Sequence, residues 1–114
     1  MLSAKEKGIL LHIIKHCKRI EFKIQGMNRE DLDTNEDFKE IVCFNIFQIG
    51  ELIKKLSKEF LEKYPNMPWD DIKGMRDWVG HGYGSINLDQ IWRTIHLEIV
   101  PLREYCESIL DKEQ

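Results

Sequence analysis

The sequence predicts an all-α fold, an antiparallel bundle of four to five helices. Two observations support this class. Apolar residues recur every three or four positions through most of the chain, and no segment alternates apolar and polar residues as a half-buried strand does. The 114 residues are 42% hydrophobic and 32% charged, a composition typical of folded proteins, and we expect one helical domain over residues 1–114.

The first predicted helix begins after Ser3. Ser3 and Glu6 are three residues apart and match a capping box, in which each side chain accepts a hydrogen bond from the backbone N–H of the other residue. An apolar stripe at helical spacing follows, made of Ile9, Leu10, Ile13, Ile14, Cys17, Ile20 and Ile24. The sequence therefore predicts a long amphipathic helix at this end of the chain.

An acidic stretch at residues 29–37 separates the first helix from the second. We expect a loop here, with room for a single helical turn, and we expect Thr34 or Asn35 to cap the helix that follows. This second helix is predicted to be long and central, because one apolar stripe continues through residues 38–60 before Pro65 stops it.

Two further helices are predicted in the second half of the chain. A short one starts near Pro68, since proline is accepted in a first turn, and the glycines within residues 80–84 end it. Asn87 and Gln90 form a capping box for the last helix, which is expected to kink at Pro101.

The charge of the chain is −3, with 17 basic and 20 acidic residues, which argues against coating nucleic acid or membrane by bulk charge. The charges are nevertheless uneven, since residues 1–25 hold six basic and two acidic side chains while residues 26–40 hold two and six. One basic set lies on the first two helices: Lys15, Lys18, Arg19, Lys23, Lys54, Lys55 and Lys58. It either guides an RNA backbone toward a cleft or forms ordinary solvated helix faces.

Membrane spans, secretion signals and metal sites are not predicted. No apolar run approaches the roughly 18 residues of a span, and no cleavage site follows the apolar run of the first helix, so a cytoplasmic protein is expected. Cys17, Cys43 and Cys106 lack C-x-x-C spacing and are expected to be reduced residues on helix faces. His12 and His16 have the spacing of a metal pair, but no third ligand is evident.

Residues 74–84 hold the pattern R-x-x-x-x-H-x-Y, formed by Arg76, His81 and Tyr83 at a glycine-rich helix end. On a regular helix Arg76 and Tyr83 lie on one stripe and Asp77 can contact His81, but Arg76 and His81 diverge by about 140°. The two converge only if the glycines distort the helix end or if the site combines residues from two chains.

These residue types suggest phosphodiester chemistry without a metal. His81 can exchange a proton near neutral pH, and Asp77 would orient its ring. Arg76 can donate paired hydrogen bonds to phosphate oxygens while a ribose 2′-OH attacks its own phosphate. One His81 supplies either the base or the acid, so a two-fold homodimer with both copies in one cleft would supply both.

The sequence resembles the HepT-like toxin family of the HEPN superfamily in this motif and in three further segments. They are Ile49-Gly50-Glu51, Tyr64-Pro65 followed by Pro68-Trp69, and Asn87-Leu88 followed by Trp92. The resemblance covers residues 38–110 well and the first helix loosely. It implies a HEPN-like helical bundle.

The resemblance also implies a metal-independent ribonuclease toxin of a type VII-like toxin–antitoxin system, acting on cellular RNA, including tRNA, at a dimer cleft. Its partner would be a minimal nucleotidyltransferase antitoxin that transfers AMP from ATP to a tyrosine, and the chain itself would use no cofactor. Carried over by position, Arg76 and His81 are catalytic and Tyr83 accepts the AMP. The added phosphate and nucleoside would then occupy the place near Arg76 meant for RNA phosphate.

Structural interpretations of the same residues remain open. Arg76 could pair with an aspartate on its own helix, and Tyr83 could pack its ring against a neighbouring helix. Glu51 lies among apolar residues and either pairs with a cation such as Arg76 or reaches solvent. For the whole protein, the alternative is a non-catalytic subunit that binds a nucleotide or docks the nucleotidyltransferase.

Overall fold

The all-α class is confirmed. The computed structural model describes the backbone of residues 1–80 and 87–113, and the side chains of residues 1–74 and 87–113. The helices of this part are α1 (Ala4–Lys23), α2 (Asp31–Thr34), α3 (Glu36–Lys54), α4 (Lys58–Lys63), α5 (Trp69–Gly80), α6 (Leu88–Leu97) and α7 (Ile99–Lys112). Five of them have ten or more residues, and the described part of the chain contains no strand.

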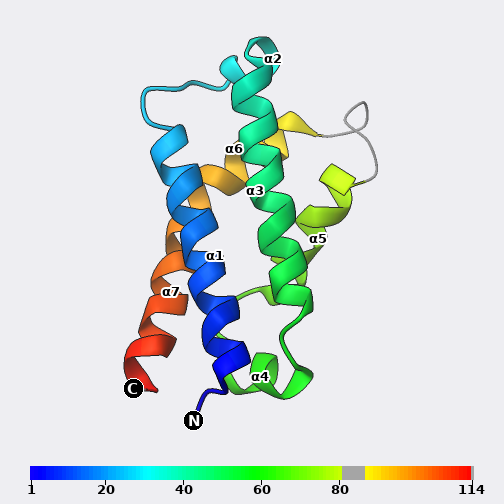
Figure 1. The fold of residues 1–114 in the computed structure, drawn as a ribbon. Helices are drawn as coiled ribbons and strands as arrows, with labels where there is room; N and C mark the ends of the chain where they lie inside the picture. The colour runs from blue at the N-terminus through cyan, green and yellow to red at the C-terminus, as the bar shows by residue number, and fades with distance from the viewer. Residues whose placement is uncertain (81–86, 114) are drawn as a thin grey trace.

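Helix α3 lies at the centre of the bundle. It packs against α1 on one side and α5 on the other, and α7 packs against α1 (Figure 1). The core between these helices consists mainly of fully buried isoleucine, leucine and cysteine side chains, among them Leu10, Ile13, Cys17, Ile46, Ile49, Ile72 and Leu102. Helix α5, which carries the first part of the R-x-x-x-x-H-x-Y motif, thus packs on the central helix.

The predicted helix starts are confirmed by their caps. The Ser3 hydroxyl accepts from the Glu6 N–H at 3.0 Å, and the Glu6 carboxylate accepts from the Ser3 N–H at 2.9 Å. Asn35 caps α3 by accepting from the Phe38 N–H at 3.0 Å. Each bond satisfies a backbone donor that the first turn of a helix leaves unpaired, which is why these short motifs predict helix starts well.

The acidic stretch and the end of α1 also follow the expectation. Residues 29–35 form a loop that contains the single turn of α2, while Glu36 and Asp37 already belong to the first turn of α3. Gly26 has a φ of +74°, which a residue with a Cβ rarely adopts, so this glycine allows the chain to leave α1 and turn toward α2.

The prediction of one uninterrupted second helix through residues 38–60 is wrong. Helix α3 ends at Lys54, where the N–H groups of residues 55 and 56 bond to carbonyls only three residues back. Ser57 then caps α4 by accepting from the Phe60 N–H at 3.0 Å. The apolar stripe continues across the break because Leu56 and Phe60 are both buried in the same core, so periodicity alone could not reveal the turn.

The sequence predicted a kink at Pro101, but the chain breaks three residues before this proline. The last helical segment breaks at Glu98, between α6 and α7, and Pro101 lies in the first turn of α7. A proline ring clashes with the carbonyl four residues earlier, so a regular helix cannot pass Leu97 and Glu98 unchanged. In the first turn of a new helix Pro101 lacks no hydrogen bond, because the N–H groups there have no partner within the helix.

Candidate functional site

Helix α5 carries the first half of the motif, and its N-terminal part is firmly anchored. The Trp69 side chain is buried, and its indole N–H donates to the Tyr64 carbonyl at 2.7 Å. Ile72, one turn later, is fully buried. These two side chains fix α5 against the core, so its backbone carries Arg76 and Asp77 at defined places in its second half.

The motif residues themselves are described only in part. Arg76 and Asp77 belong to α5, but the described side chains stop at residue 74 and resume at 87. His81 and Tyr83 lie outside the described residues. The predicted convergence of Arg76 with His81, the contact of Asp77 with His81 and the placement of Tyr83 therefore stay predictions.

Glu51 lies on α3, the helix against which α5 packs. Its side chain is partly buried. The fold thus brings together the two helices that carry Glu51 and Arg76, as a pairing of the two residues requires, and the pairing itself stays a prediction.

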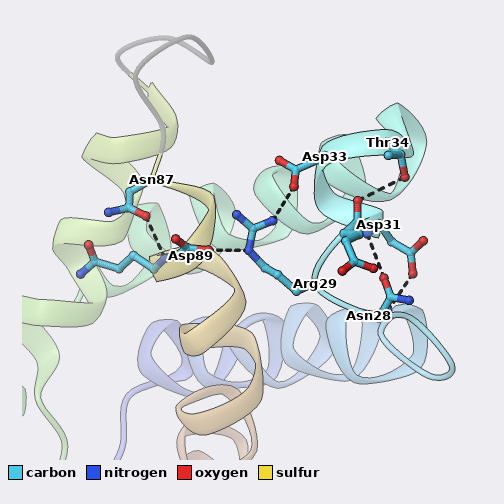
Figure 2. A network of polar contacts seen from close by, with 9 residues as sticks. Asn28, Arg29, Asp31, Asp33, Thr34, Asn87 and Asp89 are labelled. Carbon is cyan, nitrogen blue, oxygen red and sulfur yellow. Dashed lines mark hydrogen bonds and ion pairs between the residues drawn. The ribbon is translucent and has the colours of Figure 1, made fainter.

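The chain after the motif is tied to the acidic loop by a polar network (Figure 2). Asn87 caps α6 by accepting from the Gln90 N–H at 3.2 Å. Next to this cap, Arg29 donates from Nε to Asp89 at 2.7 Å and from Nη1 to Asp33 at 3.0 Å. The hydrogen bond to Asp89 is the main cause of a raised pKa for Arg29. Both ends of the motif segment are thus attached to the bundle, by α5 packing on α3 and by Arg29.

A basic groove lies between α1 and α3 and has a volume of about 880 Å³. We use the term basic groove for the surface formed by Lys15, Lys18, Arg19, Phe22, Lys23 and Phe44. The two phenylalanines are exposed, Phe22 by 74% and Phe44 by 52%. Sequence reasoning identified the cations but missed the aromatic rings; the available signal was that Phe22 follows Lys15 and Lys18 on the polar stripe of α1.

His16 lies next to the groove residue Phe44, with 6.4 Å between the centroids of the two rings. It is buried, and its Nδ1 lies 2.7 Å from the Asn45 side-chain oxygen on α3. Because the Asn45 amide nitrogen donates to the Ile41 carbonyl at 2.7 Å, its oxygen faces His16, and His16 Nδ1–H must be the donor. Burial lowers the pKa of His16 below its ordinary value of 6.5, and the nearby Arg19 and Lys15 act in the same direction against the Asn45 bond.

The cysteines are confirmed as reduced residues on helix faces. Cys17, Cys43 and Cys106 are free and buried. Burial raises the pKa of Cys43 to about 11 and that of Cys106 to about 12, and it raises the pKa of Cys17 further. Nucleophilic chemistry needs the thiolate, so these residues serve packing.

The described residues contain neither a cluster of metal ligands nor a helix suited to span a membrane. Among residues 1–74 and 87–113, no three His, Cys, Asp or Glu side chains are grouped as metal ligands. Within the same part of the chain, no helix combines the length and apolar character that crossing a bilayer requires.

Comparison with known proteins agrees with this architecture. The family model described as "Ribonuclease HepT-like" matches residues 13–109, which include the motif. A relative named "Putative RNase TTE0752", from Caldanaerobacter subterraneus subsp. tengcongensis, is 36% identical over 92% of this chain and 94% of its own length. "Putative RNase MJ1216" of Methanocaldococcus jannaschii is 31% identical over 91% of this chain and 86% of its own.

A third relative carries the family's name. "Probable ribonuclease HepT" of Thermococcus cleftensis is 25% identical over 70% of this chain and 86% of its own length. No solved structure matches the chain.

Proposed function

Because this chain belongs to the HepT-like ribonuclease family, we propose that it is a metal-independent endoribonuclease with Arg76 and His81 as its catalytic residues. The observation that carries the proposal is the family match over residues 13–109, which spans the whole R-x-x-x-x-H-x-Y pattern. The chemistry of the residue types supports it, since a histidine can move a proton and an arginine can stabilise the phosphate charge that develops during internal transesterification of RNA.

In the proposed reaction the ribose 2′-OH attacks the adjacent phosphorus. The bond from O2′ to phosphorus forms and the bond to the leaving 5′ oxygen breaks, giving a 2′,3′-cyclic phosphate and a 5′-hydroxyl. A base removes the 2′ proton, and an acid protonates the leaving oxygen. His81 serves in one of these roles, and Arg76 donates to the phosphate oxygens where negative charge develops.

A homodimer would complete the site. Each chain holds one His81, whereas the reaction needs both a base and an acid. Two chains related by a two-fold axis would present two copies of Arg76 and His81 in one cleft. Asp77 and Glu51 would support the site, Asp77 by orienting the His81 ring and Glu51 by pairing with Arg76.

Regulation by a partner is the second part of the proposal. The protein would act as a toxin on cellular RNA such as tRNA, neutralised by a minimal nucleotidyltransferase antitoxin. The Tyr83 oxygen would attack the α-phosphate of ATP, pyrophosphate would leave, and AMP would remain on the tyrosine. Its negative phosphate would then compete with RNA near Arg76, so inhibition would not require unfolding.

Substitution of the two catalytic residues tests the reaction. We expect Arg76→Ala and His81→Ala each to lower RNA cleavage by at least about 10²-fold and to abolish growth inhibition, while sedimentation still shows a folded dimer. Arg93→Ala and His12→Ala are matched controls, because both side chains are exposed and lie on other helices. Full cleavage by either motif variant would refute the proposal. An unsubstituted protein that cleaves no RNA, together with tight partner binding that survives both substitutions, would favour the partner-binding subunit.

Intact mass tests the modification. After incubation with ATP and the nucleotidyltransferase, the protein should gain the mass of one or more AMP groups, and Tyr83→Phe should prevent the gain. Tyr105→Phe is the control, since Tyr105 lies on α7. A gain that persists in Tyr83→Phe would assign the modification to another residue.

A further inference from the structure

We propose that the basic groove between α1 and α3 binds single-stranded RNA, with Phe22 and Phe44 as stacking surfaces and the lysines of α1 as phosphate contacts. The inference rests on the proposed ribonuclease function for the identity of the ligand. It adds an RNA-contacting surface between α1 and α3. Helix α5, which carries Arg76, packs on the other side of α3 (Figure 1).

The aromatic rings are the first observation. Phe22 is 74% exposed and Phe44 is 52% exposed, although burying a phenylalanine side chain would stabilise the fold. Single exposed apolar residues are common, but two rings in one concavity mark a binding surface. A base presents a flat π-face to such a ring, whatever its identity.

Charge is the second observation. Four cations line the groove, namely Lys15, Lys18, Arg19 and Lys23, against one carboxylate, that of Glu40. A polyanion complements this surface. A second copy docked about a two-fold axis would instead place these cations against their own counterparts, which electrostatic repulsion disfavours.

Preorganisation of Phe44 is the third observation. Its ring meets the His16 ring edge-on, with 6.4 Å between centroids and 69° between planes. His16 is itself held by Asn45, whose amide is fixed by the Ile41 carbonyl. The Phe44 ring is therefore positioned before a ligand arrives, which reduces the entropy lost on binding.

Single-stranded RNA fits a surface of exposed aromatic rings and cations better than a duplex or a folded protein does. Bases in a duplex are already stacked on each other, whereas unpaired bases can lie on aromatic side chains. The volume of about 880 Å³ is within the roughly 300–1,000 Å³ of small-ligand sites, which suits a few nucleotides.

The test measures binding apart from cleavage. A fluorescein-labelled 12-nucleotide RNA with 2′-O-methyl groups lacks the attacking hydroxyl, so its anisotropy reports binding by the full chain without turnover. We expect Phe22→Ala to weaken binding by about 5- to 150-fold, the range reported for loss of one stacked base. Phe22→Trp should retain the affinity of the unsubstituted protein, because it preserves an aromatic face.

Two further variants distinguish base stacking from a general effect of exposed apolar side chains. Phe22→Leu keeps an apolar side chain but removes the ring, and it should bind almost as weakly as Phe22→Ala. Leu97→Ala removes an exposed apolar side chain from α6, outside the groove, and should leave binding unchanged.

Lys18→Glu and Lys7→Glu change the net charge equally on the same helix, but only Lys18 lines the groove. Lys18→Glu should weaken binding at least tenfold and flatten the salt dependence, since each lost phosphate contact removes about 0.7 from its log–log slope. Lys7→Glu should have a much smaller effect.

Three results would overturn the proposal. Equal weakening by Lys18→Glu and Lys7→Glu would show attraction by bulk charge, and binding by Phe22→Leu equal to that of the unsubstituted protein would show that no base stacks there. Unchanged RNA binding together with an altered sedimentation coefficient in Phe22→Ala would show that a second copy covers the groove.

Failure of this inference and failure of the proposed ribonuclease are separable. The binding assay contains no cleavable bond, so it gives its result whether or not Arg76 and His81 are catalytic. Conversely, loss of cleavage in Arg76→Ala and His81→Ala stands whether or not the basic groove contacts RNA.

Discussion

Two arginines of the bundle each hold two carboxylates, yet they hold them in different ways. Arg103 on α7 donates to both oxygens of Glu21 on α1, from Nε at 2.6 Å and Nη2 at 3.0 Å, and its Nη1 donates to Glu107 at 2.7 Å. Arg29 donates single bonds to Asp89 at 2.7 Å and to Asp33 at 3.0 Å. The first arginine joins two long helices, and the second joins the acidic loop to the chain that follows the motif.

Exposure to water separates the two clusters further. The Arg103 and Glu21 side chains are 21% and 24% exposed, whereas Asp89 is 84% exposed. Water and salt compete with an exposed ion pair much more effectively than with a shielded bidentate one. Helices α1 and α7 thus form a tightly fixed scaffold, while the chain after the motif is attached by contacts that can open locally.

The largest effect on stability is expected when the Arg103 cluster is broken. Arg103→Ala leaves Glu21 and Glu107 without their shared cation and should lower the free energy of unfolding by ~1–2 kcal/mol in urea denaturation. Arg93→Ala, at an exposed site on α6, is the matched control. A loss no larger than that of the control would mean that the cluster does not fix the scaffold.

The next effect concerns His16 and appears as a pH dependence of stability. Burial lowers the pKa of His16 in the folded chain, so below its ordinary value of 6.5 the unfolded chain binds more protons than the folded one. The neutral His16 ring therefore contributes fully to the free energy of unfolding above pH 6.5. This contribution falls as the pH drops from 6.5 through the lowered pKa. Unfolding midpoints at pH 7.5, 6.5 and 5.5 measure the decline.

Substitution identifies the histidine responsible. His16→Gln should flatten the decline between pH 7.5 and 5.5. His12→Gln, one turn earlier on the exposed side of α1, should leave it unchanged. Equal slopes in the His16→Gln variant and the unsubstituted protein would assign the pH dependence to other groups.

The smallest effect is expected at Arg29. Arg29→Gln should leave the midpoint of global unfolding unchanged, because the pairs it breaks are exposed. Amide hydrogen exchange at Gln90 and Ile91 should nevertheless become faster, since the start of α6 loses its tie to the acidic loop.

Lys58→Gln, which breaks the exposed Lys58–Glu62 pair on α4, controls for the loss of one charge. If Arg29→Gln lowered global stability as much as Arg103→Ala does, there would be no contrast between the two arginines.

Features that depend on residues close together in the chain could be predicted from the sequence alone. The caps at Ser3, Asn35 and Asn87 are closed by residues within one helical turn, so a local pattern was enough to predict them. The apolar period predicted the all-α class, because one face of each long helix must be buried. The motif predicted candidate residues and their chemistry, since side-chain type and spacing carry that information.

Contacts, helix breaks and surfaces that depend on residues far apart in the chain arise only in the tertiary structure. The His16–Asn45 and Arg29–Asp89 contacts join positions 29 and 60 residues apart, and no local rule predicts either. The breaks at residues 55–57 and at Glu98 lie where packing redirects helices whose apolar stripe continues. The basic groove likewise exists only because α1 and α3 lie side by side, which places Phe44 of α3 on one surface with Phe22 and the four cations of α1.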